Sequence, residues 1–350
     1  MNNVLTKDTS IGIRKMSVWL PPHFQTGEEI AALSGIPEHV VKTKMGIVRK
    51  SRATPEMQPS MMAVEAAKKV LVGIDPLSVD MVIWTGSEYK DHIVWSAGIF
   101  VQRELGLRNA IAFDIGARCS NKILGLMIAK SLMQTNPNLK RVLLAGGHKT
   151  GDLVNYRDPN SRFLYNLADG GSAILLEKGA PNPLLESSFV TDGDFSLDVI
   201  VPAGGTKNPT RNHPKVEDTY LQVPDVDGMR QRLERSSIHN FMKVIKEAST
   251  QSMNKPIDYL SILHMKKSAH DEILKLTELK EEQSIYLDHF GHYGAPDQVL
   301  SIGLAERQKK LKKGDHVCLA SAGIGYTWSA LSMRWDEPTF DQSLHKDLDY

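Results

Sequence analysis

The feature that most constrains the fold of this 350-residue chain is an internal repeat, because the second half echoes the first. Four pairs of segments recur in the same order: IDPLSVDMVIWTGSE and NKPIDYLSILHMKKS, DIGARCSNKILGLMIAK and DHFGHYGAPDQVLSIGLAE, RVLLAGGHKTG and HVCLASAGIGY, and GGSAILLEKG and TWSALSMRWD. Chance explains any single pair, but four pairs in one order favour a duplication. We therefore predict two related halves, residues 1–185 and 186–350.

Short apolar runs alternate with longer amphipathic segments, which is typical of strands that cross over through helices in an α/β fold. The expected strands are Val79–Thr85, Ala110–Ile115, Arg141–Ala145 and Ser172–Glu177. The expected helices are Met61–Val72, Trp95–Leu105 and Ser120–Gln134. If a pseudo-twofold axis relates the two halves, equivalent strand-to-helix turns point toward a common centre.

Cys119 lies at one of these turns and is one of only two cysteines in the chain. An unpaired cysteine is more often a small buried hydrophobe than a reactive group. The start of the helix Ser120–Gln134 favours a reactive thiol, because the unpaired N–H groups and the dipole of a helix N-terminus stabilise thiolate over thiol. Cys318 lies inside the apolar strand His316–Ala320, and we predict that it packs in the core.

Two histidines and a glycine-rich loop lie at turns or strand ends, as Cys119 does. The repeat aligns the turn FGHYGAP, which carries His292, with the turn of Cys119, and so places these two side chains face to face. His264 ends the apolar run Tyr259–Leu263, where sites in open α/β sheets collect. The loop AGIGYTW offers the backbone N–H of Gly325 as an oxyanion donor beside that of Cys119, although a tight turn also explains its glycines.

Charge and cysteine content restrict the partners and the compartment. Lys and Arg total 42 against 41 Asp and Glu, so the formal charge of +1 gives no bulk reason to bind nucleic acid or a membrane. Two cysteines form no disulfide framework and fit no zinc-ligand spacing, which indicates a reducing compartment. No signal peptide is recognisable, and no apolar run approaches the ~20 residues that span a bilayer. We expect a cytoplasmic protein.

Several motifs along nearly the whole chain resemble the ketoacyl-ACP synthase III group of thiolase-fold condensing enzymes. They are KTKMGIVRK, AFDIGARCS, RDPNSR followed by LADGGSAIL, SILHMKKS, HFGHYGAPDQVLSIGLAE and KKGDHVCLASAGIGYTWSA. The resemblance implies an α/β, thiolase-like duplicated five-layer α/β/α/β/α fold in a homodimer. It also implies carbon–carbon bond formation between acyl thioesters carried on acyl carrier protein or coenzyme A, with no metal or redox cofactor.

The resemblance assigns roles to individual residues. Cys119 corresponds to the acyl-accepting nucleophile, and His264 to the histidine that stabilises the thioester enolate. The third catalytic position of the family is normally an asparagine, and here it holds His292. Tyr326 falls beside the acyl pocket, next to Gly325. Substrate-entrance positions fall on Arg118, Arg162 and Lys267.

Three departures separate this chain from an ordinary acetyl-CoA-primed initiator of fatty acid synthesis. Lys267 replaces an asparagine that follows the first histidine in the family. Val40 and Val48 stand where an aromatic residue and an arginine grip coenzyme A. His292 replaces the third catalytic residue, so a Cys-His-His set resembles the elongating synthases instead.

These departures favour a specialised ketosynthase/cyclase of secondary metabolism that joins a β-ketoacyl thioester to a second acyl thioester. The branch that forms dialkylresorcinols and stilbenes is the nearest in character. An ester- or amide-forming acyltransferase, a fatty acid synthesis initiator and a non-catalytic partner subunit are the alternatives. On the sequence alone, His292→Asn is expected to leave acylation of Cys119 largely intact while reducing condensation.

Overall fold

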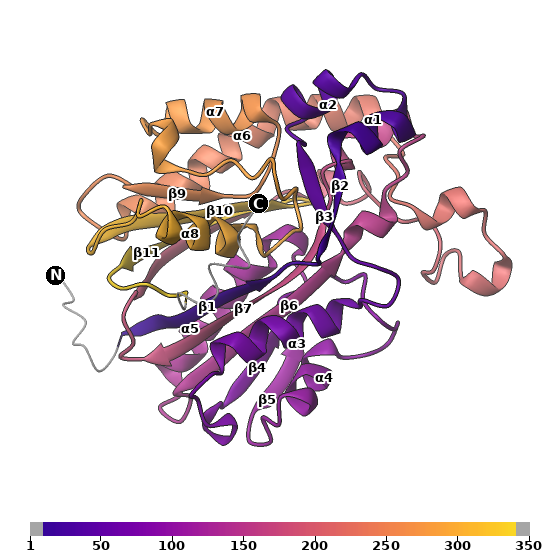
Figure 1. Ribbon diagram of the computed structural model, residues 1–350. Helices are drawn as coiled ribbons and strands as arrows, with labels where there is room; N and C mark the ends of the chain where they lie inside the picture. Colours follow the sequence, from indigo (N-terminus) through magenta and orange to yellow (C-terminus); the bar gives the residue numbers. More distant parts are fainter. Residues whose placement is uncertain (1–9, 341–350) are drawn as a thin grey trace.

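The computed structural model describes residues 10–340 and arranges them in five layers, in the order helix, sheet, helix, sheet, helix (Figure 1). This is the predicted duplicated α/β/α/β/α architecture. The predicted division after residue 185 falls inside the first strand of the second sheet, Leu184–Thr191.

The first sheet has five strands in the order β1-β7-β6-β4-β5. Their bounds are β1 Ile11–Trp19, β4 Met81–Trp84, β5 Ile111–Asp114, β6 Arg141–Lys149 and β7 Asp169–Lys178. Strand β7 runs antiparallel to both β1 and β6, whereas β4 runs parallel to β6 and β5.

The second sheet repeats this pattern with four strands in the order β8-β11-β10-β9. Their bounds are β8 Leu184–Thr191, β9 Tyr259–Ile262, β10 Asp315–Gly323 and β11 Thr327–Trp335. Strand β11 is antiparallel to β8 and β10, and β9 is parallel to β10. The pairs β1/β8, β4/β9, β6/β10 and β7/β11 therefore occupy equivalent places, and the sequence repeat predicted the last three of them.

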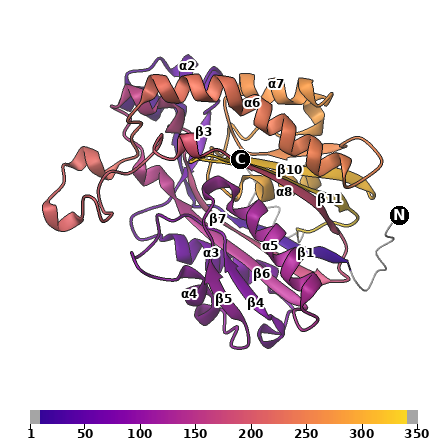
Figure 2. The ribbon, with the colours of Figure 1, turned by 180° about the vertical axis from the view of Figure 1, so that it is seen from behind.

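The helices fill three layers (Figure 2). Their bounds are α3 Pro59–Val70 and α4 Ala97–Glu104 outside the first sheet, α5 Asn121–Thr135 and α8 Asp297–Arg307 between the sheets, and α6 Val226–Thr250 and α7 Lys267–Leu276 outside the second. Helices α5 and α8 are the equivalent pair, and each begins just after one of the turns that the repeat aligned. The two turns therefore meet in the middle of the molecule.

Smaller elements cover the top of the layers, as seen in Figure 1. They are β2 His23–Thr26, α1 Gly27–Ser34, α2 Glu38–Thr43 and β3 Arg49–Arg52, with β2 and β3 paired antiparallel. A segment with the short 3₁₀ helices Thr210–Asn212 and Val216–Thr219 projects from the body between β8 and α6.

Sheet strands bury both faces because helices cover them on both sides. All four residues of β4, with the sequence MVIW, are buried, which explains why this strand reads as a continuous apolar run rather than an alternating one. The predicted strands and helices are all present, with ends that differ by a few residues. Cys318 is fully buried in β10, as predicted, and burial raises the pKa of its thiol to about 12.

Glycines let helix α3 lie directly on the first sheet. A Cβ atom on Gly147, in β6, would lie 1.9 Å from the carbonyl oxygen of Pro59, and one on Gly171, in β7, would lie 2.3 Å from that of Met62. Both obstructing atoms are backbone atoms of α3. A side chain at either position therefore has to displace the helix.

We predict that Gly147→Ala destabilises the protein by about 1–3 kcal/mol, the usual cost of overpacking a core. The matched control is Gly193→Ala, because a Cβ atom at Gly193 has no neighbour within 4 Å and the backbone there is not left-handed. The control is expected to change stability by less than about 1 kcal/mol. Urea midpoints at constant m-value measure both; equal midpoints for the two variants contradict the close-packing argument.

Candidate active site

One cavity of about 1670 Å³ receives most of the residues that the sequence singled out. It opens between the two halves, near the N-terminal ends of α5 and α8. The lining includes Cys119, His264, His292, Gly325 and Tyr326. Its walls are largely aliphatic, with side chains from the N-terminal helices, from the segment before α6 and from α6 itself.

Cys119 lies in a single 3₁₀ turn, Arg118–Ser120, that leads into α5. The second sheet holds this turn from the other half of the molecule, since the Ser321 hydroxyl donates to the Cys119 carbonyl over 2.8 Å. The Ser120 hydroxyl likewise donates to the carbonyl of Thr327 over 2.8 Å. The nucleophile candidate is thus positioned by residues that are about two hundred positions away in the chain.

A continuous chain of contacts joins Cys119 to a buried carboxylate. The Nε2 atom of His292 lies 3.1 Å from the Cys119 sulfur, and its Nδ1 atom lies 2.6 Å from Oδ2 of Asp297. Asp297 is fully buried and is the first residue of α8. The face-to-face placement of Cys119 and His292 agrees with the repeat, and the geometry is that of a nucleophile, a base and a group that orients the base.

Backbone hydrogen bonds fix Asp297 and the turn of His292. Asp297 Oδ2 accepts the backbone N–H of His264 over 2.8 Å, and Oδ1 accepts that of Tyr293 over 3.1 Å. Gly291 and Gly294 both have left-handed φ values, of 79° and 80°, which accounts for the glycines in FGHYGAP. The imidazole therefore has little freedom to leave its place between sulfur and carboxylate.

The charges around His292 favour its protonated form. Burial by itself lowers the pKa of His292, but the Asp297 carboxylate and the Cys119 sulfur together raise that pKa well above 6.5. An imidazolium between sulfur and carboxylate stabilises a thiolate, which is the nucleophilic form of cysteine. This placement differs from the sequence expectation that His292 acts only on the second substrate.

His264 is buried at the end of β9, as predicted, but its ring forms a hydrogen bond with the backbone of another segment. Its Nε2 atom lies 2.9 Å from the carbonyl oxygen of Gly46, to which only an N–H can donate. Burial, with the charge of His292, lowers the pKa of His264 to about 3, so the ring is neutral and carries that single proton. In this arrangement the proton of His264 Nε2 is donated to the carbonyl of Gly46, and the donation to a thioester oxygen stays a prediction.

The predicted pocket and entrance residues divide into two groups. Tyr326 stacks on Trp328 with ring centroids 5.4 Å apart and lines the cavity, as do Arg118 and Arg162. The Arg118 guanidinium lies 2.8 Å from a carboxylate oxygen of Glu88, so its charge is already balanced.

Lys267 is not among the lining residues: it begins α7 and pairs with Asp271, and its neighbours Lys266 and Ser268 line the cavity instead. Lys267 is therefore not an entrance residue in this structure.

Two polar residues of the site escaped the sequence analysis. Asp297 follows His292 by five positions at a helix start. An aspartate in a first helical turn is usually explained by its favourable interaction with the helix dipole. His148, near the end of β6, is buried and lines the cavity as well. Only the fold brings these residues to Cys119, since neither spacing matches a recognisable motif.

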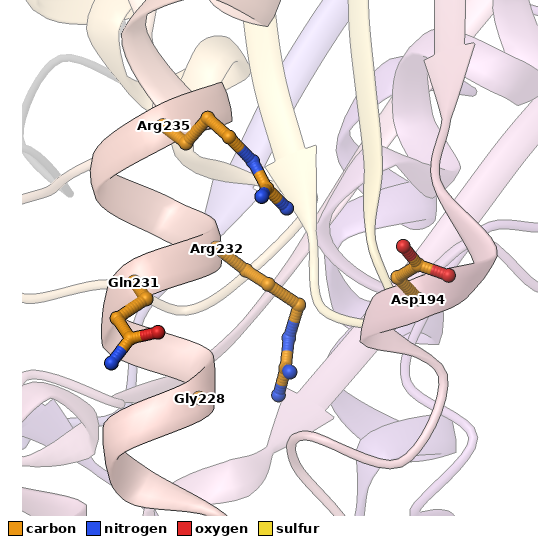
Figure 3. Close-up of a pocket in the computed structure, with 5 residues that line it drawn as sticks. All are labelled: Asp194, Gly228, Gln231, Arg232 and Arg235. Carbon is orange, nitrogen blue, oxygen red and sulfur yellow. The ribbon is translucent and has the colours of Figure 1, made fainter.

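A second, smaller pocket of about 370 Å³ lies on the surface between α6 and the turn Gly193–Phe195. Figure 3 shows Arg232 and Arg235 extending from α6 toward the segment that carries Asp194. Arg232 pairs with the buried Asp198 and, at 3.3 Å, with Asp225. These carboxylates balance the charge of Arg232, so this residue holds α6 to the loop after β8.

No group of three or more His, Cys, Asp or Glu side chains within residues 10–340 is placed to hold a metal ion. Within the same range, no helix is both long and apolar enough to cross a membrane.

Residues 113–193 match the family profile of 3-oxoacyl-[acyl-carrier-protein] synthase III, and residues 248–335 match the profile of its C-terminal part. Among curated proteins, the chain is 27% identical over 328 residues to the β-ketoacyl-[acyl-carrier-protein] synthase III of Syntrophomonas wolfei, covering 90% of this chain and 95% of that one. It is 28% identical over 340 residues to that of Caldanaerobacter subterraneus, covering 93% and 98%.

Solved structures with similar folds extend this likeness over nearly the whole chain. The 3-oxoacyl-(acyl carrier protein) synthase III of Pseudomonas aeruginosa superposes with a TM-score of 0.81 at 19% identity, covering 94% of this chain and 99% of that one. A Cys-to-Ser variant of Xanthomonas campestris OleA with bound lauric acid and lauroyl-CoA superposes with a TM-score of 0.78 at 17% identity, covering 94% and 100%. At these identities, the superpositions establish the fold.

We predict that Asp297→Asn slows acylation of Cys119 by about 10²- to 10⁴-fold, the range that acid–base partners contribute. The amide keeps an oxygen for the backbone N–H of His264 but loses the charge that keeps His292 protonated. Intact-protein mass spectrometry over time, with an acyl thioester as donor, measures the rate. Asp336→Asn, which changes a carboxylate that pairs with Arg334 and does not line the cavity, is the control. Unchanged acylation in a folded Asp297→Asn protein contradicts the three-residue relay.

Protonated His292 also makes stability depend on pH. Because the pKa of His292 is raised in the folded protein, the stabilisation is complete below about pH 6.5 and is lost as the pH rises through the higher folded value. We expect the difference in unfolding free energy between Cys119→Ser and Cys119→Ser/His292→Gln to shrink from neutral to alkaline pH. Urea titrations across this range test the sign; a difference that widens with pH refutes it.

Proposed function

We propose that this chain, a member of the ketoacyl-[acyl-carrier-protein] synthase III family of the thiolase superfamily, joins two acyl thioesters through an acyl-enzyme on Cys119. Family membership makes it a condensing acyltransferase whose substrates are thioesters of acyl carrier protein or coenzyme A. The finer proposal is a ketosynthase/cyclase of secondary metabolism that joins a β-ketoacyl thioester to a second acyl thioester. One observation carries it, namely the contact chain from Cys119 through His292 to Asp297.

The first half-reaction uses the charged form of the Cys119–His292–Asp297 contact chain, in which Cys119 is a thiolate and His292 is protonated. The Cys119 thiolate attacks the carbonyl carbon of the first thioester and forms a new thioester on the enzyme. The carrier leaves as a thiol after its sulfur takes the proton of His292 Nε2. This leaves His292 neutral, with its remaining proton on Nδ1 held by the Asp297 carboxylate.

The second half-reaction uses the neutral form. The lone pair of His292 Nε2 now faces the acyl-enzyme and removes a proton from the α-carbon of the second thioester. The resulting carbanion attacks the acyl carbon on Cys119, a carbon–carbon bond forms, and the cysteine leaves as a thiolate beside protonated His292. The cycle thus returns to its starting charges without consuming a proton or releasing carbon dioxide.

A neutral imidazole base restricts the second substrate to a thioester with an acidic α-proton. A β-keto group makes the neighbouring α-proton far more acidic than that of a simple acyl thioester, so a neutral imidazole is a sufficient base. An asparagine has no basic lone pair and cannot take this proton. The presence of His292 where relatives carry asparagine therefore supports a condensation by proton removal, and its product is a β-keto thioester that carries the transferred acyl group on its α-carbon.

The size and lining of the cavity support two acyl substrates. Its volume of about 1670 Å³ exceeds the ≈ 300–1,000 Å³ of an ordinary small-molecule pocket. Aliphatic and aromatic side chains line it from both halves, including Leu153, Leu221 and Phe241. The OleA structure with lauric acid and lauroyl-CoA has a similar fold, and we propose that medium to long acyl chains occupy the cavity here.

An ester- or amide-forming acyltransferase is the second candidate, because neutral His292 can also deprotonate an alcohol or amine that attacks the acyl-enzyme. The names of the curated relatives favour a third, initiation of fatty acid synthesis with a malonyl thioester. The three reactions share the acyl-enzyme and differ in the second substrate. Product mass distinguishes them: a new carbon–carbon bond with all carbons kept, an ester or amide, or a product that has lost carbon dioxide.

The test follows a ¹³C-labelled β-ketoacyl thioester with the acylated enzyme. We predict condensation in the wild type with every labelled carbon kept in the product. His292→Asn is expected to slow both half-reactions by about 10²-fold or more, because the base and the partner of the thiolate are lost together. Liquid chromatography with mass spectrometry measures product and isotope content, and intact-protein mass spectrometry measures acylation.

Cysteine variants provide the controls. Cys119→Ala is expected to abolish both the acyl mass on the protein and the product, whereas Cys318→Ser keeps both, since Cys318 is buried in the core away from the cavity. Full turnover by Cys119→Ala, or a product that forms only from malonyl thioester with release of carbon dioxide, overturns the proposal.

A further inference from the structure

The second substrate of the proposed condensation carries two oxygens that take up charge. When the α-proton of a β-ketoacyl thioester leaves, the negative charge is shared between the thioester oxygen and the β-keto oxygen. The family resemblance assigns the thioester oxygen to His264. The β-keto oxygen distinguishes this substrate from a simple acyl thioester, so a site that selects it gains from a second hydrogen-bond donor.

The hydroxyl group of Tyr326 has the properties of this second donor. Tyr326 lines the cavity together with Cys119 and His292. Within residues 10–340 its Oη atom forms no hydrogen bond, yet it is not sealed in the interior without a partner, as Oη of Tyr293 is. The Tyr326 hydroxyl therefore reaches the open space of the cavity, where a ligand can accept its hydrogen bond.

Aromatic and backbone contacts fix the direction of this side chain. The ring of Tyr326 stacks on that of Trp328 with centroids 5.4 Å apart, and it meets the ring of Phe195 edge to face at 5.0 Å. The backbone N–H of Asp192 donates to the Tyr326 carbonyl over 3.1 Å, and the N–H of Tyr326 donates back over 3.4 Å. The hydroxyl is therefore preorganised, which is what makes a donor effective in a transition state.

The hairpin that carries Tyr326 packs against the turn of the nucleophile. The Ser321 hydroxyl donates to the Cys119 carbonyl over 2.8 Å, and the Thr327 carbonyl accepts the hydroxyl of the next residue in that turn over 2.8 Å. A Cβ atom on Gly323, at the end of β10, would lie 2.2 Å from a backbone oxygen just before the turn. This close packing fixes the place of Tyr326 relative to Cys119.

The strand order places Tyr326 and His264 on opposite sides of β10. His264 follows β9 and Tyr326 precedes β11, both at the edge of the second sheet where β10 ends. β10, which holds the Cys119 turn, lies between those two strands. The two carbonyl groups of a β-ketoacyl thioester flank its α-carbon in the same way. A thioester oxygen on the side of His264 therefore leaves the β-keto oxygen on the side of Tyr326.

The phenol keeps its proton and so acts as a donor. Burial and the charge of Cys119 raise the pKa of Tyr326 above its usual value of about 10. Burial persists when Cys119 is acylated, so the hydroxyl stays protonated in the second half-reaction as well. It therefore does not compete with His292 for the α-proton.

We propose that the Tyr326 hydroxyl donates a hydrogen bond to the β-keto oxygen of the second acyl thioester, and so selects a β-ketoacyl substrate and stabilises its enolate. The inference rests on the proposed function, since it concerns the second substrate in the same cavity. It adds a donor to the one that the family resemblance assigns to His264. No covalent bond forms or breaks at Tyr326, and its proton stays on Oη throughout.

The first measurement compares the two half-reactions in Tyr326→Phe and the wild type. Phenylalanine keeps the ring that packs on Trp328 and Phe195 and removes only the hydroxyl. We expect condensation with a β-ketoacyl thioester to slow by about 10²- to 10³-fold, the usual cost of losing one preorganised donor, while acylation of Cys119 by a simple acyl thioester stays within about threefold. Product mass and intact-protein mass spectrometry measure the two rates.

The second measurement tests the β-keto oxygen itself in the Cys119→Ala background, where thioesters bind without acylating the protein. The two ligands are a β-ketoacyl thioester and a simple acyl thioester of the same chain length, both on the carrier that supports condensation by the wild type. Adding Tyr326→Phe is expected to weaken binding of the β-ketoacyl ligand by about three- to tenfold and that of the other ligand by less than about twofold. Isothermal titration calorimetry measures the four affinities.

The matched control is Tyr156→Phe, which removes the hydroxyl of a half-buried tyrosine that donates to Gln25 over 2.6 Å and does not line the cavity. Its rates and affinities are expected to match those of the wild type. Condensation at the wild-type rate in Tyr326→Phe, an equal loss of acylation and condensation, or an equal loss of affinity for both ligands overturns the assignment. Absence of a condensation product from the wild type instead refutes the proposed function, so the two failures are distinguishable.

Discussion

The site depends on the buried carboxylate of Asp297. This one side chain accepts the Nδ1 proton of His292 and the backbone N–H groups of His264 and Tyr293, so it ties the end of β9 and the glycine turn to the start of α8. A buried charge is costly unless it is paired and hydrogen-bonded, and here three donors from two segments bind the carboxylate. Removing the carboxylate would affect the base, the turn and the helix end together.

The duplication explains why these groups meet. Helices α5 and α8 occupy equivalent places between the sheets, so the turns before them converge, one with Cys119 and the other with His292. The Ser321 hydroxyl and the Thr327 carbonyl of the second sheet hold the cysteine turn, and the carbonyl of Asn166 in the first half accepts the backbone N–H of His292 over 2.8 Å. Each half thus positions the reactive residue of the other.

Sequence reasoning reached the elements and the pairing of the two turns but not all of the chemistry. The repeat predicted β4, β6 and β7 together with their second-half counterparts, because buried strands of a covered sheet read as uninterrupted apolar runs. It also predicted that Cys119 and His292 face each other. It missed Asp297 and His148, and it placed Lys267 at the entrance where Lys266 lies. Those errors share one cause: a helix or strand residue shows its period in sequence, but not which atom its side chain meets.

The sequence by itself determined the duplicated α/β architecture, the helix start that holds Cys119 and the unusual histidine in the glycine turn. Local patterning decides these features, since apolar period and turn residues act over a few positions. Only the tertiary structure decided how the protons are arranged. The ring of His292 lies between sulfur and carboxylate and that of His264 is turned to Gly46, because burial and long-range partners set the charge and tautomer of each imidazole.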